Sequence, residues 1–290
     1  MTEDDGLADV LRALGVRPDA LLGRGGEAGV YALDDARVVR VPHADQSLRS
    51  LERRQALVDE LATHGTPFAL PAVLESGEVN GRAYVVERRL PGRPVIEQLA
   101  TLARADRDRL VEHHLEAAAA LGGLHLEARG WFGELIADEP VRSATWHGFL
   151  RDRAAWSVQN STPQCRAVDA TALADELPEP EHPAFVHLDA TAGNMLATGA
   201  TITAVLDIGM TSVVGDARLD PLASAVYLAA PQITPVATGR DVEVAMGWIR
   251  SAGLADLYEP ARRWLAAYWC FAVDDRPLHA WCEAVLLGES

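Results

Sequence analysis

The sequence contains no lysine, so all 26 of its basic residues are arginines. Any site in this chain that needs a permanent cation must therefore use a guanidinium group. Arginine keeps the charge of lysine and can grip a phosphate through two nitrogens at once, but it is longer and planar. The exchange of one for the other is therefore not conservative.

Cysteine is scarce, and long apolar runs are missing. The three cysteines, Cys165, Cys270 and Cys282, are odd in number and scattered, which predicts buried thiols and not a disulfide framework or a zinc site. No stretch approaches the length of a membrane span, and the first five residues are acidic, unlike a signal peptide. With 49% hydrophobic and 23% charged residues the composition is that of a globular protein, and we expect a cytoplasmic enzyme.

The net charge of −16 makes nucleic acid or an anionic membrane an unfavourable partner. An acidic protein favours a cationic small molecule instead. A protein that is acidic only for solubility would have a similar net charge. The net charge therefore indicates the sign of the charge on a ligand and nothing more.

The most informative segment is the pattern H-x-D-x-x-x-x-N at residues 187–194, which lies between two apolar stretches. Asp207 follows Asn194 by thirteen residues, at the end of a further apolar run. This spacing predicts a strand-loop-strand hairpin that carries two carboxylates and a carboxamide. Phosphoryl transfer from a nucleotide needs a group that accepts the proton of the attacking hydroxyl, or orients it, and oxygen ligands for magnesium. The pattern therefore predicts a kinase in which Asp189 is the catalytic residue and Asn194 and Asp207 hold Mg²⁺.

Taken singly, Asp189 and Asn194 could also cap a loop, because aspartate and asparagine are common turn residues. Three further features favour the catalytic interpretation. Asp207 is followed by Ile-Gly, like the D-x-G of a kinase metal loop. The run GDARLDPLA follows at 215–223, and a glycine-rich turn lies near the N-terminus.

Together these motifs resemble the aminoglycoside phosphotransferase family of small-molecule kinases. The family pattern is H-G-D-x-x-x-x-N, then D-W-G or D-F-G, then G-D-P-x-x-D-L-A, and here Leu188 replaces the first glycine. The resemblance implies an α+β, bilobal protein-kinase-like fold with an antiparallel-sheet N-terminal lobe and a mainly helical C-terminal lobe. The lobes would be a nucleotide-binding lobe at 1–92 and a catalytic and acceptor-binding lobe at 93–290. The implied reaction moves the γ-phosphate of ATP or GTP, with Mg²⁺, onto a hydroxyl of an antibiotic or small metabolite.

The resemblance also implies where the phosphates bind. Gly23, Gly25, Gly26 and Ala28 stand in the glycine-rich loop that covers them, with Ala28 at the position of the third glycine. A plain β-hairpin would use the same residues. Arg40 occupies the position of the strand lysine that contacts the phosphates.

In kinases a glutamate on the following helix pairs with that lysine. In the helix expected at 46–63, Arg54 occupies the position of this glutamate. Glu52 is nearby but points away from the apolar face of the helix. The ion pair is thus missing or rearranged. Either another acid serves Arg40, or both arginines point at the nucleotide.

The stretch 83–92 resembles the hinge between the lobes. Val86 would flank the base, and the backbone of Glu87 and Arg89 would hydrogen-bond its edge. Because backbone atoms would do this, the side chains do not distinguish ATP from GTP.

Further helices are expected at 107–126, 146–156, 166–177 and 240–285. In the last of these, Trp269 could stack on an acceptor sugar, and Asp274 and Asp275 could bind its ammonium groups. Structural roles would explain the same residues: Trp269 would fill the core, and Asp274 and Asp275 would cap a turn before Pro277.

Two alternatives remain open. A nucleotide-binding pseudokinase without turnover fits the missing lysine and displaced glutamate, whereas the intact Asp189, Asn194 and Asp207 favour an enzyme. The second open point is the identity of the acceptor. Choline-like, sugar and amino-acid acceptors are used by kinases of the same fold, and a fold does not determine its substrate. A protein kinase is disfavoured by Leu188, where those enzymes place arginine. The sequence does not indicate the oligomeric state.

Overall fold

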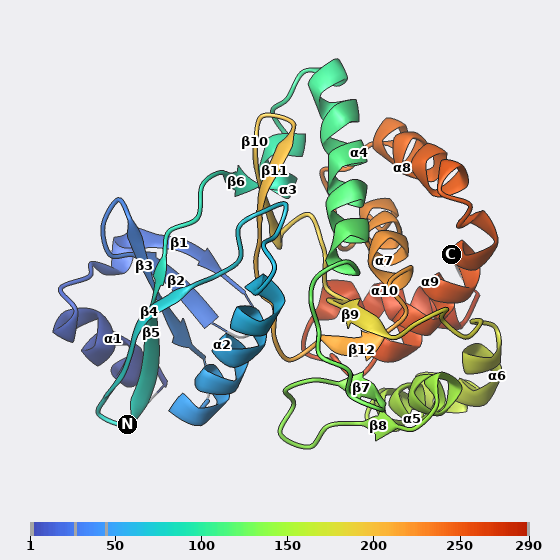
Figure 1. The fold of residues 1–290 in the computed structure, drawn as a ribbon, viewed down its shortest axis with the longest axis horizontal. Coiled ribbons are helices and arrows are strands. Elements are labelled where there is room, and N and C mark those ends of the chain that lie inside the picture. Colours follow the sequence, from blue (N-terminus) through green and yellow to red (C-terminus); the bar gives the residue numbers. More distant parts are fainter. Residues whose placement is uncertain (1–2, 26–27, 44–45, 289–290) are drawn as a thin grey trace.

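The computed structural model describes residues 3–25, 28–43 and 46–288. A sheet-rich N-terminal part lies beside a mainly helical remainder, and the long helix α4 (Arg104–Leu121) stands between the strands β10 (Met195–Thr198) and β11 (Thr201–Val205) and the helix α8 (Gly239–Ser251) (Figure 1). The α+β arrangement matches the one that the sequence predicts.

In the described residues the N-terminal strands form a five-stranded antiparallel sheet in the order β1-β2-β3-β5-β4. Alternation along the strands gives its two faces different characters. Val39 and Val86 are cross-strand partners and pack with α1 in one apolar cluster. Arg40 and Glu87 therefore lie on the opposite face, toward α2. The elements are α1 (Glu3–Ala13), η1 (Pro18–Ala20), β1 (Leu21–Arg24), β2 (Ala28–Ala32), β3 (Arg37–Pro42), α2 (Leu48–Ala62), β4 (Val73–Val79) and β5 (Arg82–Arg88).

Helix α2 is shared between the two parts of the molecule. Ser47 caps its first turn by accepting a hydrogen bond from the amide of Ser50. Leu51 packs against the sheet in a small cluster with Val85. One turn and more further on, Leu57, Val58 and Leu61 belong to the large core of the helical part. The helix thus holds the sheet face of Arg40 and Glu87, called the charged face below, against the C-terminal part.

The helical part is built around α7, which packs against α4, α8 and α9. Trp264, Tyr268 and Trp281 are buried in its core. Its helices are α3 (Val95–Leu99), α4 (Arg104–Leu121), α5 (Trp146–Gln159), η2 (Cys165–Ala167), α6 (Ala170–Asp175), α7 (Leu219–Ala229), α8 (Gly239–Ser251), α9 (Ala255–Trp269) and α10 (Arg276–Leu286). Within the described ranges, no helix is both long and apolar enough to cross a lipid bilayer.

Two small antiparallel sheets position the loops of the site. One has the strand order β11-β10-β6 and the other β8-β7-β12-β9. The segment after α2 also joins β11, because Ala69 donates to the carbonyl of Thr203 and accepts from the amide of Val205, at 2.9 and 3.0 Å. The strands are β6 (Arg93–Pro94), β7 (Phe132–Glu134), β8 (Arg142–Ser143), β9 (Ala184–Val186), β10 (Met195–Thr198), β11 (Thr201–Val205) and β12 (Val213–Gly215).

Candidate active site

The loop predicted between two strands is present and brings the polar residues together, but its flanking strands do not form one hairpin, because β9 pairs with β12 and β10 pairs with β11. Strand β9 leads into the loop that carries Asp189 and Asn194, and β10 and β11 follow as a paired hairpin that ends just before Asp207. The Asn194 side-chain amide donates to the Asp189 carboxylate at 2.7 Å and to the Asp189 carbonyl at 3.0 Å. The amide of Leu206 donates to the Asn194 carbonyl at 2.8 Å, which sets Asp207 beside this loop.

A buried carboxylate holds the backbone of the catalytic loop. Both oxygens of Asp220, at the start of α7, accept amide hydrogen bonds, from His187 at 2.8 Å and from Leu188 at 2.9 Å. Burial raises the pKa of Asp220 to about 7, against the lowering effect of these two bonds. In the sequence, Asp220 stands out only as part of the motif at 215–223. The fold shows that its carboxylate holds the loop before it.

His187 also braces the loop that carries Asp189. Its ring is fully buried, and burial lowers its pKa, so the neutral imidazole is favoured. The amide of Asp189 donates to its Nδ1 at 3.2 Å, which leaves Nε2–H as the donor to the Leu206 carbonyl at 2.8 Å.

Leu188 adopts the left-handed backbone conformation, with φ = 63°, where the family pattern has glycine. This conformation is sterically unfavourable for a leucine. Its side chain is buried in the large core, and its carbonyl accepts a hydrogen bond from the Tyr227 hydroxyl at 3.0 Å. Core packing and these hydrogen bonds therefore hold a backbone geometry that glycine would adopt without cost.

The charges beside Asp207 are rearranged relative to a kinase. Arg40 donates to Asp207 Oδ1 at 2.6 Å, and the same oxygen lies 4.0 Å from Arg54 Nη2. Burial alone would raise the pKa of Asp207, but the charges of Arg40 and Arg54 outweigh it and hold the pKa below its usual value. Of the two arrangements left open by the sequence, the structure has the one in which another acid serves Arg40, and that acid is Asp207.

Arg54 has an acid of its own. Its Nη1 donates to Glu87 Oε1 at 3.2 Å, and its Nε donates to the carbonyl of Ile208 at 2.7 Å. Glu87 was expected to act through its backbone, so this side-chain partnership was missed. The signal was present in the strand alternation, which places Glu87 on the same sheet face as Arg40.

The base-flanking position predicted for Val86 needs correction. Its side chain is buried in the cluster beneath α1, on the sheet face opposite Arg40. Val85, the cross-strand partner of Arg40, shares the charged face instead. The Arg89 amide, predicted to bond the base edge, donates to the carbonyl of Ala36 at 2.8 Å.

The glycine-rich turn is partly described. Gly23 lies in β1, and the amide of Gly25 donates to the carbonyl of Ala28 at 3.0 Å, which closes the turn into β2. An added Cβ at Gly23 or Gly25 would have no heavy atom within 4 Å, so this face of the turn is open. Ala28 is buried in β2, whereas Gly26 lies outside the described residues.

The family model of the phosphotransferase enzyme family matches residues 20–268, which include Arg40, Asp189, Asn194 and Asp207. The chain belongs to this family. It is thus a small-molecule phosphotransferase, and the resemblance drawn from the motifs is confirmed.

Solved structures show the same fold. An ADP-bound aminoglycoside phosphotransferase, APH(2'')-Ib, matches with a TM-score of 0.63 at 13% identity, over 98% of this chain and 99% of that one. The APH(2'')-IIa complex with gentamicin gives 0.64 at 16% identity, over 99% and 96%. APH(3'')-Id from Streptomyces rimosus gives 0.58 at 19% identity, over 96% and 99%. A comparison with curated protein sequences finds no match.

The residues predicted to bind the acceptor fall at the junction of α9 and α10 in this phosphotransferase. Trp269 donates from its indole nitrogen to the Tyr227 hydroxyl at 2.7 Å, and through Tyr227 it reaches the catalytic loop. Asp275 caps α10 by accepting from the amide of Leu278 at 3.2 Å, and Asp274 is exposed. An open hollow of about 790 Å³ is lined by the residues 271–277.

Proposed function

We propose that this phosphotransferase moves the γ-phosphate of ATP or GTP onto a hydroxyl of a cationic small molecule of the aminoglycoside type. The observation that carries the proposal is the loop on which Asn194 orients the carboxylate of Asp189 at 2.7 Å, with Asp207 set beside them. Asp189 would accept the proton of the acceptor hydroxyl or orient it in line with the phosphate.

The side chains present fit a magnesium ion. Asn194 directs its amide nitrogen to Asp189, which leaves its carbonyl oxygen for a metal, and Asp207 pairs with Arg40 through one carboxylate oxygen. Hard oxygen donors of this kind suit Mg²⁺. Asn194 and Asp207 would hold the ion, which would supply positive charge against the charge that develops on the phosphates.

Within this proposal, residues 1–92 form the nucleotide-binding lobe and residues 93–290 the catalytic and acceptor-binding lobe. Arg40 would contact the phosphates, and the open turn at Gly23 and Gly25 would cover them. Structures of this fold include a ternary complex with ATP and streptomycin and a complex with GDP, which supports either donor. The gentamicin complex and the acidity of this chain support a cationic antibiotic as acceptor, in resistance or self-protection.

A nucleotide-binding pseudokinase is the second candidate. The observation in its favour is the 2.6 Å pair between Arg40 and Asp207, which occupies an oxygen of the expected metal ligand. The two candidates differ in whether Mg²⁺ and nucleotide can draw Asp207 away from the guanidinium.

The deciding experiment measures thermal stability with ATP or GTP, each with and without Mg²⁺. Nucleotide at a hundredfold excess over its dissociation constant should add about 2.7 kcal/mol. We expect magnesium-dependent stabilisation that Asp207→Asn removes and that the surface variant Asp138→Asn retains. Absence of a shift with either nucleotide would contradict the proposed site.

Turnover is then measured as nucleotide consumption with aminoglycoside, choline, sugar and amino-acid acceptors. We expect consumption with the cationic polyhydroxylated compounds. Magnesium-dependent binding without consumption in any of these would favour the pseudokinase.

A further inference from the structure

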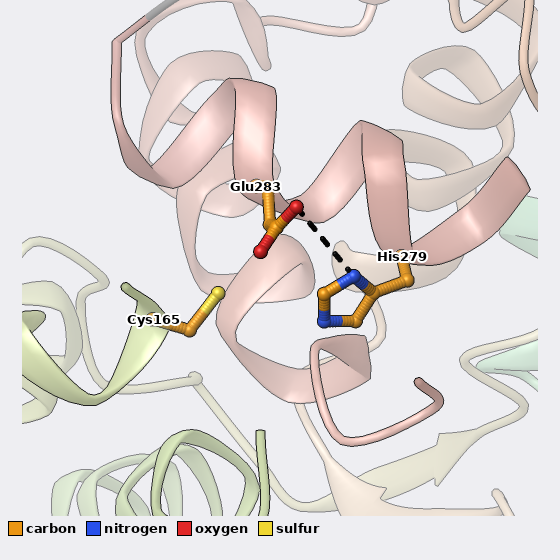
Figure 2. A group of neighbouring side chains, drawn as sticks. All are labelled: Cys165, His279 and Glu283. Atoms are coloured by element: carbon orange, nitrogen blue, oxygen red, sulfur yellow. Dashed lines mark ion pairs between the residues drawn. The ribbon is translucent and has the colours of Figure 1, made fainter. Parts of the chain in front are cut away.

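A second cluster of chemically reactive side chains lies where η2 meets α10 (Figure 2). Cys165, His279 and Glu283 each contribute one potential ligand atom, and these atoms all lie within 4.8 Å of one another. His279 and Glu283 are four residues apart on α10, so they project from one face of that helix. The Cys165 sulfur points toward the Glu283 carboxylate from the opposite segment.

The hydrogen bonds around His279 fix the orientation and the tautomer of its ring. Ser161 donates its hydroxyl proton to the carbonyl of Cys270 at 2.6 Å. In the 3.2 Å contact between Ser161 Oγ and His279 Nε2, the ring nitrogen must therefore be the donor. A neutral ring then has a lone pair on Nδ1, which faces Glu283 Oε2 at 3.8 Å, too far for a hydrogen bond. His279 Nδ1 and Glu283 Oε2 are thus two electron-pair donors that face each other, and their separation leaves room for a cation bound to both.

Glu283 is held in the same way. Thr162 donates to its Oε1 at 2.7 Å, which leaves Oε2 toward His279. Metal-binding histidines and carboxylates are commonly oriented by a hydrogen bond through the atom that does not touch the metal. Ser161 and Thr162 provide such bonds to both residues, and they lie just before Cys165 in the chain.

The third donor is a sulfur. Cys165 is fully buried, and its sulfur lies within 4.8 Å of the ligand atoms of both other residues. A thiolate and a carboxylate together neutralise a divalent cation, so the occupied cluster would carry no net charge into the protein interior. Glu283 is partly exposed, which gives an ion a path from solvent.

We propose that Cys165, His279 and Glu283 form a binding site for a borderline-soft divalent cation such as Zn²⁺, with water as the fourth ligand. Binding releases the thiol proton of Cys165 to solvent. A mixed set of sulfur, nitrogen and oxygen suits zinc, whereas Mg²⁺ and Ca²⁺ need oxygen donors. The ion would join η2 to the C-terminal helix α10, and because it binds only the folded chain, it would stabilise the whole protein.

The test titrates the metal-free, reduced, full-length protein with Co²⁺ and follows its absorption. We expect one Co²⁺ per chain with a thiolate-to-cobalt charge-transfer band, which Zn²⁺ abolishes by displacement and Mg²⁺ does not. Zn²⁺ should also raise the melting temperature. The band separates this site from the catalytic one, because Asp189, Asn194 and Asp207 offer no sulfur.

Variants assign the ligands. Cys165→Ser should remove the band, and Glu283→Gln, near the surface, should keep the fold while weakening the affinity at least about tenfold. Cys282→Ala, which removes a buried thiol of α10 outside the set, and His125→Gln, from the surface pair with His64, should bind like the unmodified protein. No band in the unmodified protein, a band that survives Cys165→Ser, or equal affinity in Glu283→Gln would overturn the proposal.

Discussion

The catalytic loop and the charged face of the N-terminal sheet are two halves of one site, and they have departed from the family pattern to different degrees. The loop keeps its carboxylates and carboxamide at the family spacing, and Leu188 still adopts a backbone geometry that suits the glycine of the family pattern. The sheet and α2 instead carry Arg40 and Arg54, and the acids that pair with them are Asp207 and Glu87.

The difference follows from how each half is held. Backbone hydrogen bonds fix the loop within a few residues, so a change there must reproduce one conformation. On the sheet face, long guanidinium groups meet acids from distant segments, and partners can be exchanged while the positive and negative charges still balance. The loop thus conserves geometry, and the sheet face conserves charge.

The largest effect is expected at the catalytic loop. Asp189→Ala should lower kcat/KM by about 10²–10⁴-fold, because it removes the group that accepts or orients the acceptor proton. Nucleotide-induced thermal stabilisation should stay nearly unchanged, since Arg40 and Asp207 remain. The exposed aspartate variant Asp138→Ala is the control for turnover. Loss of turnover and of nucleotide binding together would contradict this division of roles.

On the charged sheet face, Arg54→Met should lower the free energy of unfolding by about 3 kcal/mol, because it leaves Glu87 buried without its partner. Arg53→Met, the neighbouring residue with an exposed partner, should cost less than about 1 kcal/mol.

A double-mutant cycle sharpens this result. With Glu87→Gln, the coupling energy from urea unfolding should be about 1–3 kcal/mol. Additive effects of Arg54→Met and Glu87→Gln would mean that the two side chains do not stabilise each other.

Beneath the catalytic loop, Asp220→Asn should cost about 2 kcal/mol, because an amide NH₂ would then face one of two backbone N–H donors. The pKa of Asp220 is raised to about 7, so folding favours its protonated form. Its contribution to stability is therefore present below about pH 4 and is lost as the pH rises toward 7.

Urea unfolding between pH 4 and 8 should show this slope in the unmodified protein and a flatter one in Asp220→Asn. Asp241 provides a control without a slope in this range. Burial would raise its pKa, but its bonds from Arg107 and Thr238 lower it, so its contribution is lost only as the pH falls below about 4. Identical pH profiles for Asp220→Asn and the unmodified protein would contradict the assignment.

The smallest effects are expected at the α9–α10 junction. Asp275→Ala should cost about 1 kcal/mol through loss of a helix cap, and Asp274→Ala less than about 0.5 kcal/mol. If either carboxylate binds an ammonium group of the acceptor, the KM for a cationic acceptor should rise severalfold in its variant. An unchanged KM in both would leave Asp274 and Asp275 with structural roles alone.

Local patterns predicted the elements and the catalytic loop well. The helix expected at 107–126 spans Arg104–Leu121 and ends before two glycines, and the loop of Asp189 and Asn194 forms as its spacing indicates. These features depend on neighbours in the sequence, which a single chain displays directly.

Features that join distant segments were not accessible in this way. The ion pair between Arg54 and Glu87 depends on which faces of α2 and β5 meet. The burial of Val86 depends on which face of β5 packs against α1. The meeting of Cys165 with His279 depends on the docking of α10, whereas the scattered spacing of the cysteines alone predicted no zinc site.

Helix α2 has a consequence for how the protein unfolds. Its first turns pack on the N-terminal sheet, and its last turns, with Leu57, Val58 and Leu61, are part of the core of the helical half. A segment built into both cores cannot melt with one and remain folded with the other, so the two halves lose structure in a single cooperative transition. A ligand that binds at either half therefore protects the backbone amides of both from hydrogen exchange.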